Sequence, residues 1–298
     1  MKNYEEQYLA MVADVLNNGV DIPNKRTGTY TKALFDYKLV VAEDEFPFST
    51  IRSLPPRLAF EEFWFFLNGK TDTKELEAKG INFWKGNTSR DFLDSRGLHH
   101  LPEGDLGRAY SKQFRNFGGL YANTMAVDQL AKTFNELKTD PYSRRMVVNL
   151  WNPLEEKEMC ITPCWWSHQF VVLPSERGDT LHMKLTNRSL DSLMGANMAV
   201  MQYRLYQIAL AKALGMRVGK LSCDLTHVHL YENQFEYVKE MLHRPHNHEG
   251  CYDIQRVQIN KSLNTLEDVL SLTWDDWVIS MPNVNVTPFV TLRPHMVA

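Results

Sequence analysis

Cys164 is the residue in this sequence best suited to covalent chemistry. It follows a proline in CITPCWWSHQF (160–170), with Arg144 and Arg145 upstream and Arg188 downstream. Nearby cations stabilise a thiolate and make it nucleophilic, and guanidinium groups also pair bidentately with phosphate. The pattern indicates a nucleophilic cysteine beside a phosphorylated substrate. A buried structural thiol is equally consistent with it, because cysteine is so often a core residue.

Composition and charge narrow the class of ligand. The chain has 298 residues, 44% hydrophobic and 23% charged, so it can bury a large core. No repeat, low-complexity tract or linker divides it, and residues 1–298 are expected to form a single domain. The formal net charge of -3 predicts no broad basic surface. We therefore expect a small anionic ligand and no nucleic-acid partner.

The remaining global features concern location and metals. The N-terminal sequence is acidic and amphipathic, unlike a signal peptide, and no apolar run is long enough to span a bilayer. We expect a cytoplasmic protein with no membrane partner, in which the four cysteines are free thiols. Neither the cysteines nor the histidines have the spacing of metal ligands, so no metal site is predicted.

The elements that must position Cys164 follow from hydrophobic periodicity and breaker residues. Helices are predicted over 4–17, 57–69, 127–141, 190–214 and 230–243. A strand pair is predicted over 29–42, and single strands over 144–153, 168–174 and 180–189. Segregated strands and helices favour an α+β layered fold.

Motifs along nearly the whole chain carry a family resemblance. In order, they are KRTGT (25–29), EEFWFFLNGKT (61–71), GDLGRAYSKQFR (104–115), DPYSRRMVVNLWNP (140–153), CITPCWWSHQF (160–170), NRSLD (187–191) and VHLYENQ (228–234). Together they resemble the motifs of thymidylate synthases and their pyrimidine hydroxymethylase relatives. The resemblance implies a mixed β-sheet flanked by helices and a homodimer formed through that sheet.

The resemblance also implies a mechanism. The family transfers a one-carbon unit from 5,10-methylenetetrahydrofolate to C5 of a deoxypyrimidine monophosphate. Cys164 would attack C6 of the base, which makes C5 nucleophilic. Glu62 would organise water and protons around O4, Tyr110 matches the catalytic-site tyrosine, and Asn197 would read the base edge.

The resemblance assigns further residues to the two ligands. Those expected to bind the nucleotide are Arg26, Arg188 and Ser189 at the 5′-phosphate, Arg144 and Arg145 from a second subunit at the same phosphate, and His229 and Tyr231 at the sugar. Those expected to bind the folate are Trp84, Asp191 and Gly195.

Three departures from the family pattern bear on the reaction. Trp165 stands where the synthases have histidine, and an indole cannot accept a hydrogen bond. The loop GANMA (195–199) is shorter by two residues when aligned on its asparagine; an alignment without a gap places Ala199, not Asn197, at the base. The tyrosine that precedes the family's C-terminal tail is not evident.

These departures favour hydroxymethylation of dUMP over its methylation to dTMP, because all three lie where water or hydride completes the reaction. Methylation is the first alternative. Modification of dCMP and a catalytically inactive nucleotide- or RNA-binding protein are the others.

Overall fold

The computed structural model describes residues 2–24, 28–120, 125–245 and 251–281. Arg26, an expected phosphate ligand, and the C-terminal tail, where the family's tyrosine is not evident, lie outside these ranges. No helix in the described ranges is long and apolar enough to cross a membrane.

Within the described residues, the main sheet has seven strands and is mixed. Its order is β1 (Val20–Asn24), β2 (Thr29–Val41), β7 (Arg217–Tyr231), β5 (Thr180–Asn187), β4 (Trp165–Leu173) and β3 (Val147–Asn149), with β6 (Leu190–Asp191) beside β7. β7 runs parallel to β5 and β6, and the other neighbours are antiparallel. A small antiparallel sheet pairs β8 (Val257–Ile259) with β9 (Trp277–Ile279).

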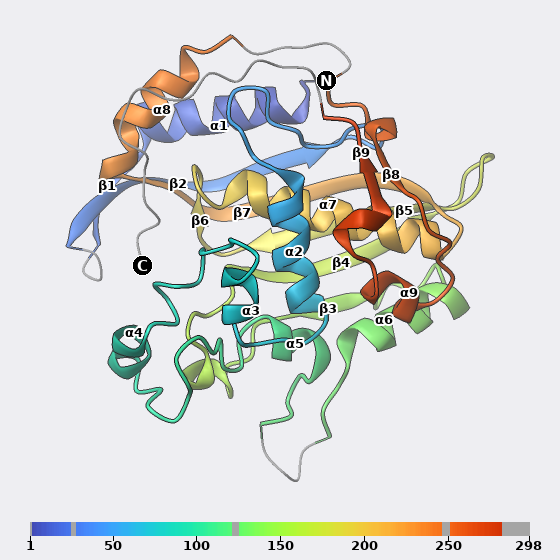
Figure 1. The fold of residues 1–298 in the computed structure, drawn as a ribbon. Helices are drawn as coiled ribbons and strands as arrows, with labels where there is room; N and C mark the ends of the chain where they lie inside the picture. Colours follow the sequence, from blue (N-terminus) through green and yellow to red (C-terminus); the bar gives the residue numbers. More distant parts are fainter. Residues whose placement is uncertain (1, 25–27, 121–124, 246–250, 282–298) are drawn as a thin grey trace.

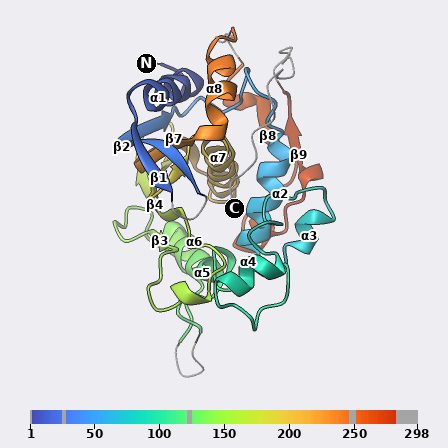
Figure 2. The same cartoon turned by 90° about the vertical axis from the view of Figure 1, so that its left-hand side faces the viewer.

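Helices pack against the main sheet. The α-helices are α1 (Tyr4–Asn18), α2 (Pro56–Leu67), α3 (Lys74–Glu77), α4 (Arg90–Ser95), α5 (Ser111–Arg115), α6 (Gln129–Thr139), α7 (Ala196–Ala213), α8 (Phe235–Leu242) and α9 (Leu266–Leu270). Short 3-10 helices occur at Glu156–Glu158, Glu232–Gln234, Ile254–Arg256 and Trp274–Asp276. α7 lies against one face of the sheet and α2 lies beyond it (Figures 1 and 2). The α+β fold and the mixed sheet are confirmed.

The central helix α7 is buried on nearly all sides, which fixes it firmly between the sheet and α2. Its Arg204 is fully buried and donates hydrogen bonds to the carbonyl oxygens of Ala42, Glu45 and Gly219. Burial lowers the pKa of Arg204 to about 9. Buried backbone carbonyls need partners, so this one side chain ties α7 to the chain beyond β2 and to β7.

The opposite face of the sheet carries exposed apolar side chains. Along β4, His168, Phe170 and Val172 are buried, while Val171 and Leu173, which alternate with them, are exposed on the other face. On β2, Phe35 is 82% exposed. No helix of the described chain covers this face in Figure 2. Apolar side chains grouped on an open face are typical of a contact surface.

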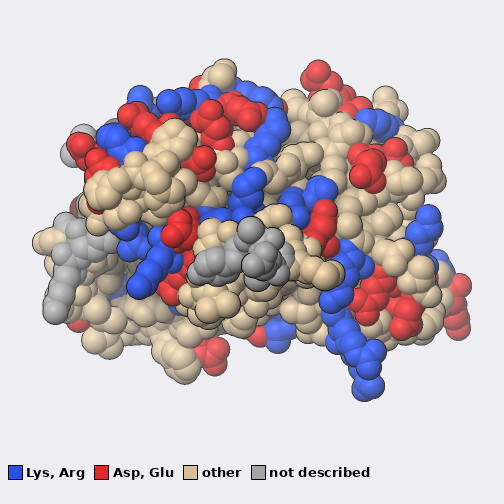
Figure 3. Space-filling view, turned by 90° about the horizontal axis from the view of Figure 1, so that it is seen from below, with Lys and Arg blue, Asp and Glu red and all other residues tan. Residues whose placement is uncertain are grey.

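Surface charge is mixed on the face drawn in Figure 3. Acidic and basic side chains are interspersed there, rather than gathered into one basic area. The described part of this face therefore differs from the continuous basic surface that a nucleic-acid backbone favours.

Three predicted elements need correction. Residues 29–42 form one strand, β2, whose hairpin partner is β1, so the predicted strand pair is wrong. The helix predicted from residue 190 begins at Ala196, because β6 and a turn precede it. The helix predicted from residue 230 begins after β7, the longest strand, which continues to Tyr231. All three segments are rich in apolar residues, as the sequence showed. Their conformation was decided by strand pairing that involves β7, which is distant in the sequence from β2 and β6.

Candidate active site

A cavity of about 340 Å³ lies between α2, α7 and the segment that enters β4. The predicted site residues that line it are Glu62, Trp84, Tyr110, Cys164, Ser189, Asp191 and Gly195. These residues come from distant parts of the sequence. The fold therefore brings the predicted nucleophile, the predicted glutamate and the expected folate ligands into one concave site.

Cys164 is half-buried at the start of β4, and its surroundings suit a thiolate. The Nη2 of Arg188 lies 3.8 Å from its Sγ. That guanidinium is fixed by hydrogen bonds to the carbonyl oxygens of Thr162, at 2.7 Å, and Pro163, at 3.0 Å. The backbone N–H of Cys164 donates to the hydroxyl of Tyr110 at 2.9 Å. A fixed positive charge beside a positioned sulfur favours the nucleophilic form.

A second cysteine shows the contrast. Cys160 is fully buried, and burial raises the pKa of its thiol to about 12. The three residues between the two cysteines thus separate an inert core thiol from one that lines a cavity. This answers the alternative that the sequence pattern left open: Cys164 is not a fully buried core residue.

Glu62 lies on α2 and is 7% exposed. Its Oε1 accepts a hydrogen bond from Trp84 Nε1 at 2.6 Å, and its Oε2 accepts one from Gln202 Nε2 at 2.5 Å. Burial raises the pKa of Glu62 to about 7, although both hydrogen bonds act in the opposite direction. A carboxyl group with this pKa can exchange protons with a substrate at neutral pH.

Asp191 and Gly195 form the wall where β6 leads into α7. The Oδ1 of Asp191 accepts the backbone N–H groups of Leu193, at 3.1 Å, and Met194, at 2.9 Å. Gln234 Nε2 donates to its Oδ2 at 3.0 Å. Burial raises the pKa of Asp191 despite these contacts. Three residues of its own chain therefore hold the carboxylate in place just before the N-terminus of α7.

The prediction for Asn197 is not supported by its position. Asn197 is 3% exposed and does not line the cavity; its Oδ1 accepts a hydrogen bond from the hydroxyl of Tyr4 at 2.8 Å. The cavity wall instead includes Ala199, as the alignment without a gap predicts. The physical reason is helical phase: Asn197 lies two residues after Gly195, about 200° around the helix, whereas Ala199 lies one full turn away.

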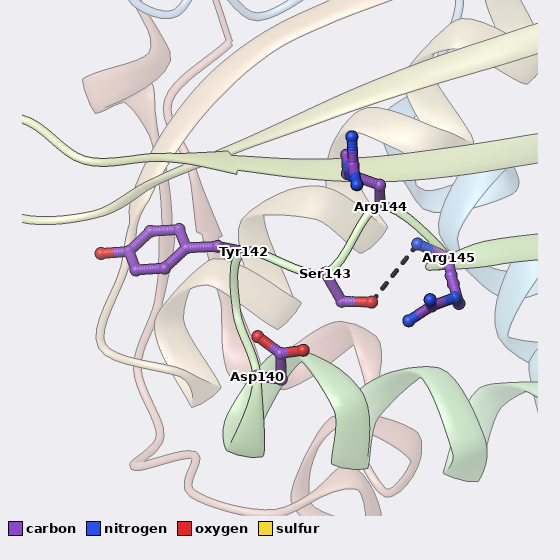
Figure 4. A pocket seen from close by; sticks show the side chains of 5 residues that line it. All are labelled: Asp140, Tyr142, Ser143, Arg144 and Arg145. Carbon is purple, nitrogen blue, oxygen red and sulfur yellow. Dashed lines mark hydrogen bonds between the residues drawn. The ribbon is translucent and has the colours of Figure 1, made fainter.

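The two predicted phosphate arginines lie elsewhere. Arg144 and Arg145 are exposed and line a separate surface pocket of about 410 Å³ together with Asp140, Tyr142 and Ser143. In Figure 4 the two guanidinium groups point in different directions. The backbone N–H of Arg145 donates to Ser143 Oγ at 3.3 Å. Within one chain, these arginines do not join the cavity.

His229 and Tyr231 are buried at the end of β7. His229 pairs with the cavity residue Asp191 between β6 and β7, but neither His229 nor Tyr231 lines the cavity. The rings of His229 and Tyr231 are nearly perpendicular, with centroids 5.2 Å apart. His227 Nδ1 lies 3.2 Å from His229 Nδ1. In the described chain, no group of three His, Cys, Asp or Glu side chains could hold a metal ion.

Sequence reasoning missed Gln202, Tyr203 and Arg52, which also line the cavity. Gln202 carried a usable signal. Gly195, Met198, Ala199 and Gln202 follow the i, i+3, i+4, i+7 spacing of one helix face. Phasing α7 from Gly195 would have found Gln202 and excluded Asn197.

A family model and curated relatives match most of the chain. The thymidylate synthase family model matches residues 6–280. The chain is 36% identical to thymidylate synthase of Homo sapiens over 247 residues, which cover 80% of this chain and 77% of the human one.

Two other relatives are longer. The bifunctional dihydrofolate reductase-thymidylate synthase of Leishmania major is 36% identical over 255 residues, covering 82% of this chain and 48% of that protein. The probable thymidylate synthase of Schizosaccharomyces pombe is 34% identical over 252 residues, covering 80% of this chain and 40% of that protein. The chain thus spans about half the length of these two relatives or less. It belongs to the thymidylate synthase family, whose one-carbon donor is methylenetetrahydrofolate.

Proposed function

We propose that the protein is a thymidylate synthase that methylates dUMP at C5 to give dTMP. The family match and the names of the relatives favour this reaction. The observation that carries the proposal is the pairing, in one cavity, of Cys164 beside Arg188 with Glu62, whose pKa burial raises to about 7.

Cys164 and Glu62 divide the chemistry. The thiolate of Cys164 adds to C6 of uracil, which places electron density on C5 and O4. Tyr110 holds the backbone of Cys164 at 2.9 Å, so the sulfur is fixed before the substrate enters. Glu62 is positioned to accept and return protons at the base, directly or through water. Arg188 stabilises the thiolate before attack.

The cavity fits a folate. Its wall includes the apolar side chains Phe83, Trp84, Ile161 and Met194, with the carboxylate of Asp191 among them. A flat pterin with polar edges matches an apolar wall that carries a fixed acceptor such as Asp191. Methylenetetrahydrofolate, when bound, supplies the one-carbon unit and the hydride that reduces it.

Hydroxymethylation, favoured by the sequence departures, has less support than methylation. The three relatives described above all carry thymidylate synthase in their names. Trp165 lines the cavity and is 7% exposed, so its indole presents apolar surface where a water would have to sit. Exclusion of water favours completion by hydride.

The residues expected to bind the nucleotide phosphate do not meet within one chain. Arg188 and Ser189 are near Cys164, whereas Arg144 and Arg145 are in a separate exposed pocket. We propose a homodimer through the open face of the sheet, where Phe35, Val171 and Leu173 are exposed. In that dimer, Arg144 and Arg145 of each chain would bind the phosphate in the partner's site.

The test is the product of the reaction. The protein is incubated with dUMP and methylenetetrahydrofolate, the nucleotide product is identified by mass, and dihydrofolate is followed by absorbance. We expect dTMP and an equal amount of dihydrofolate. A product one oxygen heavier than dTMP, formed without dihydrofolate, would instead establish the hydroxymethylase. No conversion of dUMP or dCMP would contradict both.

A further inference from the structure

Gln202 is a buried amide in the cavity wall. It is 6% exposed, and its Nε2 donates to Glu62 Oε2 at 2.5 Å. No residue in the described ranges donates a hydrogen bond to its Oε1. One end of the amide is therefore committed to the protein, and the other is available to a ligand.

The cavity face of α7 offers few alternatives to Gln202. Met198 and Ala199, which precede it on this face, have no hydrogen-bonding groups suited to a base edge. Asn197, the amide that the sequence suggested, is bonded to Tyr4 in the core. Gln202 lies three residues after Ala199, on the same face of α7, and lines the same cavity.

Glu62 sets the orientation of the amide. The ionised carboxylate accepts hydrogen bonds and repels a carbonyl oxygen, which favours the observed orientation with Nε2 of Gln202 at Glu62 and Oε1 on the other side. Trp84 occupies the other oxygen of Glu62 at 2.6 Å, which holds the carboxylate in place. The result is a fixed acceptor inside the cavity that contains Cys164.

We propose that Gln202 determines base specificity by accepting the N3–H of uracil through Oε1. This inference rests on the proposed function, because it requires a pyrimidine whose C6 meets Cys164. Uracil carries a hydrogen on N3, whereas N3 of cytosine is itself an acceptor and faces Oε1 with a lone pair. Cytosine could reach Oε1 with its 4-amino group only by shifting in the site, which moves C6 relative to the sulfur.

The experiment measures nucleotide binding without folate, by calorimetry, on the full chain. The ligands are dUMP, dCMP and N3-methyl-dUMP, and the variants are Gln202→Met and Gln202→Leu. Wild type is expected to bind dUMP on the order of 10- to 100-fold more tightly than the other two, the usual effect of an unpaired buried hydrogen-bonding group. In both variants the preference should fall below about 3-fold, mainly through weaker dUMP binding.

Trp84→Phe is the matched control. It removes one hydrogen bond to Glu62 but keeps the hydrogen bond between Gln202 and Glu62 that orients the amide. The preference for dUMP, measured without folate, should therefore persist in it. Thermal melting verifies that each protein is folded.

Three results would overturn the inference. The preference could survive in a folded Gln202 variant, it could be lost equally in Trp84→Phe, or it could be absent from wild type that binds dUMP. If the preference survived, the role of Gln202 would be limited to its hydrogen bond with Glu62, and another group would select the base. A wild type that binds neither dUMP nor dCMP would be a different failure, since it contradicts the proposed function itself and the inference with it.

Discussion

The cavity and the pocket around Arg144 and Arg145 differ in how far their side chains are buried and held by hydrogen bonds. In the cavity, Glu62 is buried and held by two hydrogen bonds, and Cys164 is held by Tyr110 and Arg188. The arginines, by contrast, are exposed to solvent. The fold of a single chain already orders Glu62 and Cys164, so little side-chain entropy remains to be lost when a substrate binds. Groups left in water are suited to completing a site on another molecule.

The largest effect is expected at the nucleophile. Cys164→Ala should lower kcat on the order of 10⁴-fold or more, because no other group in the cavity can form the covalent bond. Binding of dUMP should change little, as judged by calorimetry. Turnover within tenfold of wild type would show that the cavity is not where the covalent step occurs. Cys160→Ala is the control thiol and should keep wild-type activity if the protein remains folded.

Glu62→Gln should reduce kcat on the order of 10²- to 10⁴-fold, the usual contribution of a proton-transfer group. The pH profile gives a sharper test. Because burial raises the pKa of Glu62 to about 7, wild-type activity should fall as the pH decreases through about 7. The amide cannot titrate, so this step should be missing from the residual activity of the variant. A step near pH 7 that persists would assign it to another group.

Mixing two inactive variants tests whether the arginine pocket serves a second chain. Arg145→Ala lacks the expected phosphate ligand and Cys164→Ala lacks the nucleophile. After the chains are exchanged in equal amounts, half of the dimers are mixed and each mixed dimer has one intact site. About one quarter of wild-type activity should therefore return. No recovery, together with a monomer in sedimentation at micromolar concentration, would mean that both regions act within one chain.

The smallest effect concerns the core behind the cavity. His168 on β4 is 1% exposed, and within the described residues neither ring nitrogen has a hydrogen-bond partner. Burial lowers the pKa of His168 to about 3. The unfolded chain, with a histidine pKa near 6.5, binds more protons between these values, so the free energy of unfolding falls as the pH drops below about 6.5. At pH 5 this loss is about 2 kcal/mol.

His168→Phe should remove that loss, because phenylalanine fits among the surrounding rings of Phe114, Phe170 and Tyr203 and does not titrate. Urea unfolding of both proteins at pH 8 and pH 5 measures the difference. An identical pH dependence in the two proteins would mean that His168 does not limit stability in acid.

The resemblance and local pattern predicted much of this molecule. Helices near 57–69 and 127–141 and the strands around Cys164 lie close to their predicted positions, because each has its own periodicity or stop signal. β7 was missed because it is defined by pairing with β2 and β5, which are far away in the sequence. Seven of the predicted site residues line the cavity, but Gln202 was not among the predictions, since no motif marked it.

The sequence by itself determined the chemical groups and the family: a cysteine among arginines, a glutamate, a tyrosine and the ordered motifs are properties of the chain. Only the tertiary structure decided which of them meet. Helical phase turned Asn197 toward Tyr4 and Gln202 toward Glu62. Burial then raised the pKa of Glu62, an effect of desolvation that residue identity alone does not encode.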